Sequence, residues 1–331
     1  MVATAQVSAK QWEVRVLQSS DAPAVCHLFE QVFKQPMSPE QHSWKYRPAT
    51  SCAVGVFLDG ELLGHYGGLG VNISCKGKPA RAVQIVDVMV SSAGRQGVRK
   101  QSPFFLAGRE FLERFIGYDN PYLLGYGFPS DRHMQLAVHM QLYAPVGRMF
   151  EISWPLPSPA AKLGLLHKLV RLDLTNLEKF KPALDTLWQH LRDDLPDFIA
   201  VEKDAAFIEW RYLKKPDQHY QLYLLCGRLT GKPLAVMVLK QAADHMLLLD
   251  FVGPLRVLPT VLQAAQWQAQ QLHFTKLITW CSENFVHLFA TGSASSKPLP
   301  ITTPANIWTA GPTQEELINR WWLLPGDTDY L

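Results

Sequence analysis

The sequence predicts a two-domain protein of the α/β (α+β) class, each domain built on a mixed, partly parallel central sheet flanked by helices. Three observations carry this prediction. The 331 residues suffice for two domains at about 100–200 residues each. Strand-like and helix-like patterns alternate along the chain. Their order repeats after about 165 residues, a period too long for a solenoid and typical of a duplicated domain.

The composition is that of a folded chain. Hydrophobic residues make up 47%, aromatic residues 11% and charged residues 18%, so burial can offset the entropy lost on ordering. The longest apolar stretches, such as residues 246–252, fall far short of the ~20 residues of a membrane-spanning helix. Residues 1–10 lack an apolar segment of signal-peptide length. We therefore expect a cytoplasmic protein without a membrane partner.

Charge and cysteine content exclude two further classes. A formal charge of +3 is too small to indicate a nucleic-acid partner. The cysteines are odd in number and scattered, and no two of them are separated by two intervening residues, the spacing that zinc sites need. This pattern predicts reduced thiols and no zinc site. His133 and His139 are six positions apart and do not share a helix face, so we expect no metal.

The first half begins with a strand pattern at residues 14–17 and a helical pattern at residues 21–33. A second helix carries Trp44-Lys45-Tyr46. Residues 53–68 then form a hairpin around Asp59-Gly60, because Asp-Gly between apolar runs is a strong turn signal.

The rest of the first half follows a strand–helix–strand order. An apolar strand at residues 84–90 is interrupted by Asp87. Ser102-Pro103 has the residues of a helix N-cap and first turn. A buried strand at residues 122–128 leads into a second helix start at Ser130. Crossover helices require the strands that they join to be parallel.

The second half repeats this order. Its strand and helix patterns lie at residues 169–174, 176–191, 204–212, 220–226, 234–239, 246–252 and 276–281. Asp250 occupies the position of Asp87, and Trp210-Arg211-Tyr212 that of Trp44-Lys45-Tyr46; we expect both aromatic triplets to pack helices against a sheet. Alternate prolines favour an extended linker at residues 153–165 between domains 1–152 and 166–331. Residues 321–324 resemble a closing strand, and we expect Asp327 and Asp329 to lie in a solvated tail.

The loop at residues 91–101 is the strongest functional signal. It combines glycines with Arg95, Arg99 and Lys100, and it joins a buried strand to a helix. Such a loop directs free backbone N–H groups and the positive helix end into one concavity, which suits a pyrophosphate. The alternative is a solvated surface loop with ordinary basic residues.

This order of elements resembles the GNAT superfamily of acyl-CoA N-acyltransferases, which implies two tandem GNAT-like domains. The family's loop has Arg or Gln, two residues, Gly, one residue, then Gly or Ala. Here Val98 and Lys100 stand three and five positions after Arg95, and Gly97 is one place early. The resemblance implies acetyl-CoA, or another acyl-CoA, as co-substrate. Its implied binding residues are Met89, Val90, Arg95, Gln96, Gly97, Val98, Arg99, Lys100 and Ser102.

Asp87 is the leading candidate for the base that deprotonates an amine acceptor, because burial would raise its pKa. A structural role is nearly as well supported, since Asp250 matches it. The tyrosine that serves as acid in many family members corresponds to Ala137 here. Tyr143 and Tyr126 are the candidate substitutes, with His133 and His139 as further alternatives.

The second half differs at the corresponding loop, where Pro254 and Pro259 remove N–H donors. We therefore expect that domain not to bind CoA. The function we expect is acetyl-CoA-dependent N-acylation of a primary amine on a small molecule or a protein. The alternatives are a non-catalytic scaffold that binds CoA or a protein, and transfer from aminoacyl-tRNA. The sequence carries no reliable signal of the oligomeric state.

Overall fold

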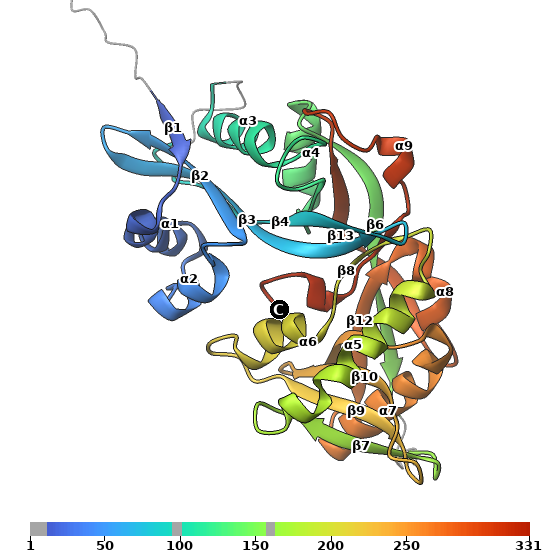
Figure 1. Cartoon of the computed structure of the whole chain (residues 1–331). Coiled ribbons are helices and arrows are strands. Elements are labelled where there is room, and N and C mark those ends of the chain that lie inside the picture. Colours follow the sequence, from blue (N-terminus) through green and yellow to red (C-terminus); the bar gives the residue numbers. More distant parts are fainter. Residues whose placement is uncertain (1–11, 95–100, 157–162) are drawn as a thin grey trace, which may run out of the picture.

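Two mixed sheets form the framework of the computed structural model, which describes residues 12–94, 101–156 and 163–331 (Figure 1). The first sheet has the order β1-β2-β3-β4-β5, and β8 and β14 extend it from β3. The second has the order β13-β6-β12-β11-β10-β9-β7. The strands of the first sheet are β1 (Glu13–Val16), β2 (Ser51–Leu58), β3 (Glu61–Cys75), β4 (Lys78–Val90), β5 (Leu124–Tyr126), β8 (Ile199–Val201) and β14 (Trp321–Trp322).

Four helices cover the two faces of the first sheet. α1 (Ala22–Phe33) and α2 (Pro39–Lys45) lie on one face, and α3 (Pro103–Phe115) and α4 (Asp131–His139) lie on the other (Figure 1). Each of the last three begins at a serine N-cap: the side chain of Ser102, for example, accepts a hydrogen bond from the Phe105 N–H at 3.4 Å. The helix starts predicted at Ser102 and Ser130 are confirmed.

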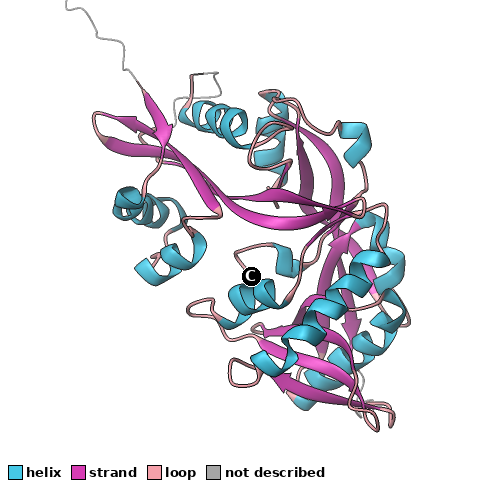
Figure 2. Ribbon diagram, viewed as in Figure 1, coloured by secondary structure: helices cyan, strands magenta, loops and turns pink. Residues whose placement is uncertain are grey.

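The second sheet is likewise flanked by helices (Figure 2). Its strands are β6 (Tyr143–Pro155), β7 (His167–Leu172), β9 (Gln221–Gly227), β10 (Pro233–Gln241), β11 (Met246–Val252), β12 (Lys276–Ser282) and β13 (Ser295–Asn306). The helices of this half are α5 (Leu177–Asp193), α6 (Ala205–Ile208), α7 (Leu258–Gln271), α8 (Val286–Phe289) and α9 (Gln314–Leu317). The predicted fold class is confirmed.

The two halves exchange strands. β6 follows α4 in sequence, yet it lies in the second sheet and pairs with β12 and β13. β8, from the second half, pairs with β3 of the first sheet. The predicted domain boundary at residues 153–165 stays a prediction: its first three residues end β6, and residues 157–162 lie outside the described ranges.

β4 and β5 separate soon after they meet. Within the described chain they pair in parallel only from Ala82 to Gln84, and β4 then continues to Val90 while β5 ends at Tyr126. The register between β3 and β4 shifts between His65 and Gly67, and Asp87 there has a φ of +47°. Such a bulge bends a strand and redirects its side chains. It aims Asp87 at α2.

The C-terminal tail (residues 323–331) is buried from residue 323 to residue 328, so the prediction of a solvated tail was wrong. Asp327 is 3% exposed. The Arg211 side chain donates to the Gly326 carbonyl at 3.2 Å and to the Thr328 carbonyl, while the Lys215 Nζ donates to the Asp329 carbonyl at 2.6 Å. These distant partners hold the tail between the two sheets (Figure 1).

The tryptophans of the two aromatic triplets pack against each other, while the tyrosines contact the sheets as predicted: Tyr46 packs edge-on against His65 of β3, and Tyr212 donates to Asp250 of β11. The rings of Trp44 and Trp210 stack at 5.2 Å. The Trp44 indole N–H donates to the Trp210 carbonyl at 2.8 Å, and the Trp210 indole N–H donates to the Trp44 carbonyl at 3.2 Å. This reciprocal contact joins equivalent points of the two halves.

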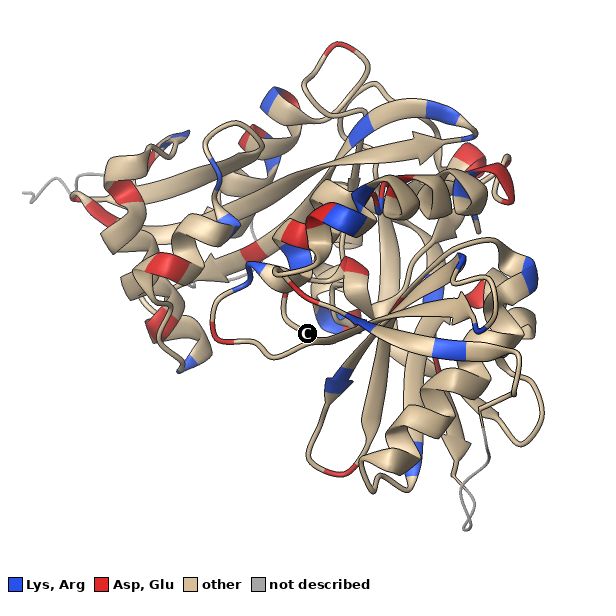
Figure 3. Ribbon diagram, turned by 60° about the horizontal axis from the view of Figure 1, so that its bottom comes forward, with Lys and Arg blue, Asp and Glu red and all other residues tan. Residues whose placement is uncertain are grey.

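Charged residues are interspersed over the described chain, with acidic and basic positions alternating along both halves (Figure 3). None of the described helices is long and apolar enough to cross a membrane.

Candidate active site

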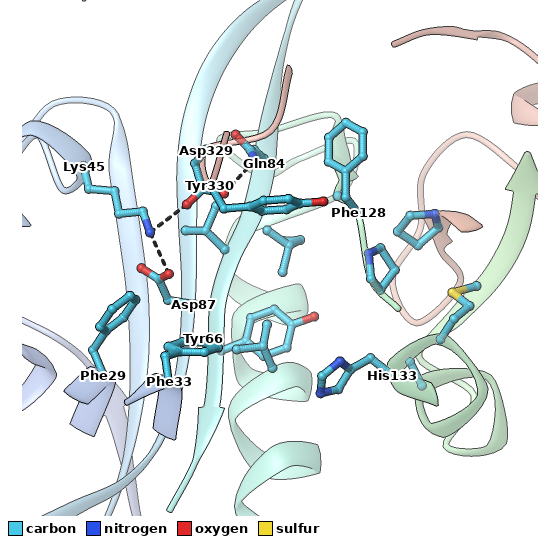
Figure 4. Close-up of a pocket in the computed structure, with 18 of the residues that line it drawn as sticks. Phe29, Phe33, Lys45, Tyr66, Gln84, Asp87, Phe128, His133, Asp329 and Tyr330 are labelled. Carbon is cyan, nitrogen blue, oxygen red and sulfur yellow. Dashed lines mark hydrogen bonds and ion pairs between the residues drawn. The ribbon is translucent and has the colours of Figure 1, made fainter. Parts of the chain in front are cut away.

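A cavity of about 560 Å³ lies across the divergence of β4 and β5. Phe29 of α1 and Lys45 of α2 line it from one face of the first sheet. Met134 and Ala137 of α4 line it from the other face, together with His133 of the same helix (Figure 4). Because the two strands no longer pair here, the cavity is lined by residues from both faces of the sheet.

Asp87 lies at the α2 side of this cavity in a network of short contacts. The Lys45 Nζ lies 2.6 Å from Asp87 Oδ1, and the Tyr46 hydroxyl donates to Asp87 Oδ2 at 2.6 Å. The side chains of Lys45 and Asp87 are only 5% and 6% exposed. The sequence predicted a buried carboxyl at this position, and the structure gives it both a cation and a hydroxyl donor.

Lys45 also binds Asp329, whose Oδ2 lies 2.7 Å from the Lys45 Nζ. Burial opposes the charged amine, but Asp329 and Asp87 outweigh it and hold the pKa of Lys45 above its ordinary value. The Gln84 amide donates to Asp329 Oδ1 at 3.1 Å. Burial opposes the Asp329 carboxylate too, yet Lys45 holds its pKa below the ordinary value. One ammonium group thus bridges two carboxylates (Figure 4).

His65 supports the bulge from inside the sheet. Burial lowers its pKa, so the ring is neutral at pH 7. A carbonyl oxygen only accepts hydrogen bonds, so Nδ1 carries the proton in its 2.6 Å contact with the Asp87 carbonyl. Gly67 makes room, since a Cβ there would lie 2.5 Å from the Tyr46 hydroxyl and 2.7 Å from the His65 ring.

Two tyrosine hydroxyls meet on the α3–α4 side. Tyr66 and Tyr143 both line the cavity and are hydrogen-bonded to each other. Burial raises the pKa of each, so both are protonated at neutral pH. Tyr143 shares the wall with Ala137, the residue at the position of the usual acid. A protonated hydroxyl is therefore available beside the alanine.

The other candidate acids lie in different surroundings. Tyr126 is 1% exposed, packs against the Trp321 ring at 5.0 Å, and is not among the residues that line this cavity. His133 lines the cavity, with its Nδ1 3.1 Å from the Ser130 hydroxyl, and His139 does not line it. The structure thus brings Tyr143 and His133 to the cavity and keeps Tyr126 in the core.

The predicted CoA residues are only partly described. Met89 and Val90 lie at the end of β4, where they pair with His65 and Gly64 of β3. The Met89 side chain is 1% exposed, and the Ser102 side chain serves as a helix cap. The predicted pyrophosphate residues Arg95, Gln96, Gly97, Val98, Arg99 and Lys100 lie outside the described ranges.

The second half contains a closed copy of the Asp87 network. Lys203 lies 2.6 Å from Asp250 Oδ1, and the Tyr212 hydroxyl donates to Asp250 Oδ2 at 2.6 Å. Lys203 also lies 3.0 Å from Asp327. The side chains of this cluster's three charged residues are fully buried. The same contacts of an aspartate with a lysine and a tyrosine therefore occur at a site whose charged side chains are fully buried.

The tail fills the second half's equivalent of the strand divergence. β11 and β12 pair only at Met246 and Leu247, as β4 and β5 pair over a short stretch. The Leu323 N–H donates to the Ser282 hydroxyl at 3.0 Å at the end of β12. A Cβ at Gly326 would lie 2.6 Å from Asp250 Oδ2. The tail is thus packed directly on the second aspartate.

Sequence reasoning missed Lys45, Tyr66, Lys215 and Asp329 as cavity residues. The Lys45-Tyr46 pair beside a tryptophan was visible, but it was interpreted as packing. Asp329 reaches the site through the path of the tail, which no local pattern indicates. No group of three or more His, Cys, Asp or Glu side chains is arranged for a metal within the described residues.

Residues 13–100 match the family model described as an acetyltransferase (GNAT) domain. Together with the two mixed sheets and the diverging strands, this match confirms the resemblance stated above. The chain is a two-lobed GNAT-fold protein. The family match lies within the first half of the chain. No curated protein sequence gives a significant match.

Solved GNAT-fold structures cover most of the chain at low identity. A protein of Enterococcus faecalis described as a probable N-acyltransferase is 12% identical with a TM-score of 0.69, covering 91% of this chain and 73% of that one. A GCN5-related N-acetyltransferase of Anabaena variabilis is 12% identical with a TM-score of 0.65, covering 90% and 73%. Saccharomyces cerevisiae N-myristoyltransferase with bound myristoyl-CoA is 11% identical with a TM-score of 0.54, covering 91% and 80%. These similarities concern the fold.

Proposed function

We propose that this protein transfers an acetyl group from acetyl-CoA directly to a primary amine on a small molecule or a protein. The observation that carries the proposal is the cavity across the β4–β5 divergence, with carboxylates on one side and a tyrosine hydroxyl on the other. Oriented reactants have a high effective molarity, so much of the rate would come from holding thioester and amine together in this cavity.

Acyl-CoA would occupy the α3–α4 side. Beyond Gln84, the backbone of β4 faces the segment 127–129 across the cavity instead of pairing with β5. Strand-edge groups of this kind bind the amides of an extended ligand, as an added strand would. The pyrophosphate would reach the loop before α3, where Arg95, Arg99 and Lys100 supply charge. The myristoyl-CoA bound by the yeast neighbour supports an acyl-CoA ligand for this fold.

The amine would enter from the α1–α2 side. The carboxylates of Asp87 and Asp329 each accept two hydrogen bonds and keep lone pairs for a third, so both can accept a hydrogen bond from an incoming ammonium ion. Asp87 would take its proton, because Lys45 outweighs burial, lowers the pKa of Asp329 and makes that carboxylate a weaker base. The amine nitrogen then forms the C–N bond as the C–S bond breaks, and it loses its second proton to water, which balances the proton that the leaving thiolate takes up. Tyr143 would donate its proton to the leaving thiolate. Tyr66 is placed to hold the Tyr143 hydroxyl in position.

The second lobe would bind no CoA. Its strand divergence is filled by the tail, and its aspartate, Asp250, is fully buried against Lys203. Prolines follow β11 where free N–H groups would be needed. This lobe would instead contribute Lys215 and the Asp329-bearing tail to the wall of the acceptor side.

A binding scaffold without chemistry is the second candidate. Ala137 stands where many relatives have an acid, and Asp87 is already held by Lys45 and Tyr46. Such a protein would bind acetyl-CoA or CoA and would release no thiol in the presence of amines.

Calorimetric titration with acetyl-CoA and thiol release across an amine panel separate these candidates. We expect binding, and we expect CoA release with at least one amine.

Replacing Arg95, Arg99 and Lys100 together by alanine should weaken acetyl-CoA binding at least about tenfold, because several phosphate contacts would be lost. Tyr143→Phe should lower kcat about 10- to 100-fold, in the range of a lost general acid. Tyr126→Phe is the matched variant away from the cavity, and a loss as large as that of Tyr143→Phe would exclude this role for Tyr143.

A further inference from the structure

The acceptor side of the cavity carries surplus negative charge. Asp87 and Asp329 share the single ammonium group of Lys45. The other lysine that lines the cavity, Lys215, donates its hydrogen bonds to the backbone carbonyls of Asp329 and Leu331 at 2.6 and 3.0 Å. Burial lowers the pKa of Lys215 to about 6, so it adds little positive charge at pH 7. A positively charged guest would therefore be favoured here.

The described lining of the same side offers a carboxylate no cation that is free of other partners. Among the described residues that line the cavity there is no arginine, and both lysines already bind oxygen atoms. An anionic group on the acceptor would lie near Asp87 and Asp329 without a cation of its own. Burying such a charge unpaired costs several kcal/mol. The wall thus discriminates against acidic acceptors.

Exposed aromatic rings flank the carboxylates. Phe33 is 44% exposed and Tyr330 is 56% exposed, and both line the cavity. Phe29 and Phe33 lie beside Asp87, while Tyr330 lies near Gln84 and Asp329 (Figure 4). Large aromatic side chains left exposed around a pocket are typical of ligand contacts. Their faces attract both apolar groups and ammonium ions.

We propose that the acceptor is a primary ammonium ion on a small apolar frame that carries no carboxylate, an inference that rests on the proposed function. Its ammonium group would donate to Asp87 and Asp329, and its frame would pack between Phe33 and Tyr330. The rings and the carboxylates together select this class. A zwitterion would bring its own carboxylate close to Asp87 and Asp329, and a polyhydroxylated amine would have no apolar frame to pack against Phe33 and Tyr330.

Calorimetric titration of the full chain in the presence of CoA, at pH 7, tests this class with three primary amines. 2-Phenylethylamine has the charge and the apolar frame, phenylalanine adds one carboxylate to it, and glucamine keeps the ammonium ion on a polyhydroxylated frame. We expect 2-phenylethylamine to bind at least about tenfold more tightly than either of the others. Equal or tighter binding of phenylalanine or of glucamine would overturn the inference.

A pair of variants tests whether the aromatic rings of the cavity contribute to the affinity for 2-phenylethylamine. Phe33→Ala should weaken the binding of 2-phenylethylamine about fivefold or more, since a cation–π contact and buried apolar area are lost. Tyr118→Ala removes an aromatic ring that is 61% exposed and does not line the cavity, and it should leave the affinity within about twofold. Equal effects of the two variants would contradict the proposed position of the frame.

Acetyl-CoA binding and thiol release, measured on the same samples, keep the two proposals apart. Binding of acetyl-CoA without any binding of 2-phenylethylamine overturns the inference and leaves the proposed transferase standing. Tight 2-phenylethylamine binding with no CoA release contradicts the transferase and supports the amine site.

Discussion

At the scale of single residues, Asp87 and Asp250 form a natural pair for separating structure from chemistry. Each carboxylate accepts one hydrogen bond from a lysine and one from a tyrosine, all at 2.6 Å. Asp87 borders a cavity, whereas the Asp250 side chain is fully buried beneath the tail. Any contribution of the ion pair to stability should therefore be common to both, while a contribution to turnover should belong to Asp87 alone.

Asp87→Asn and Asp250→Asn should each lower the free energy of unfolding by about 1–3 kcal/mol, because each loses hydrogen bonds to a buried charge. Asp87→Asn should also lower kcat at least about tenfold and leave the affinity for acetyl-CoA within about twofold. Denaturant unfolding and thiol-release kinetics measure the two effects. If the folded Asp87→Asn protein keeps full turnover, the role of Asp87 is structural, like that of Asp250.

Lys215 predicts how stability depends on pH. Burial lowers its folded-state pKa to about 6, whereas the unfolded side chain titrates near its usual 10.5. Between these values the unfolded chain binds more protons, so this group makes stability rise with pH, by at most about 1.4 kcal/mol per unit. The free energy of unfolding of wild type minus that of Lys215→Met should increase from pH 6 to pH 10. A constant difference over that range would show that Lys215 stays protonated.

Residue-level prediction from the sequence succeeded where a side chain breaks a local pattern. Asp87 interrupts an apolar strand, and it lies at the cavity as a result. Lys45 and Asp329 could not be found in this way, because their role depends on contacts between distant segments. The hydrogen bond from Gln84 to Asp329 spans 245 positions. Such proximity follows from the path of the tail and not from its composition.

At the scale of elements, the deciding feature is the separation of β4 and β5. The strands themselves and the serine caps of α3 and α4 were predictable, since periodicity and capping are local. The bulge at Asp87 was not, because it is a shift in pairing with β3. The cavity depends on both the bulge and the early end of β5.

Gly127 gives this divergence a direct test. A Cβ there would lie 3.4 Å from the Ile85 carbonyl oxygen, an ordinary contact, so the larger side chain of Gly127→Val would extend into the space between β4 and β5. We expect acetyl-CoA affinity, measured calorimetrically, to fall at least about tenfold with little loss of stability, because the wall of a preformed site is narrowed.

Gly147→Val is the matched control on β6. Its Cβ would meet no atom closer than 3.6 Å, and Gly147 does not line the cavity. Affinity for acetyl-CoA should remain within about twofold. Equal losses in the two variants would point to a general effect of introducing a β-branched residue and would exclude the assigned CoA path.

At the scale of the whole molecule, the two lobes are joined by exchanged strands and by hydrogen bonds across their interface. β6 and β8 each lie in the sheet of the opposite half, and Trp44 and Trp210 exchange hydrogen bonds across the interface. The tail is bound by Arg211 and Lys215 of the second half and by Lys45 of the first. Sequence duplication alone suggests two independent domains, because it reports ancestry and not strand pairing.

We therefore expect the chain to unfold in one cooperative transition. Differential scanning calorimetry should give a single peak whose calorimetric and van't Hoff enthalpies agree. Acetyl-CoA at 100 times its Kd should stabilise the folded state by about 2.7 kcal/mol and shift that whole peak upwards by a few degrees. The first lobe alone would bind the ligand, yet the second lobe would gain the same stability because it cannot unfold without breaking β6 and β8 out of their sheets. Two peaks, of which only one moves with acetyl-CoA, would show that the exchanged strands do not couple the lobes.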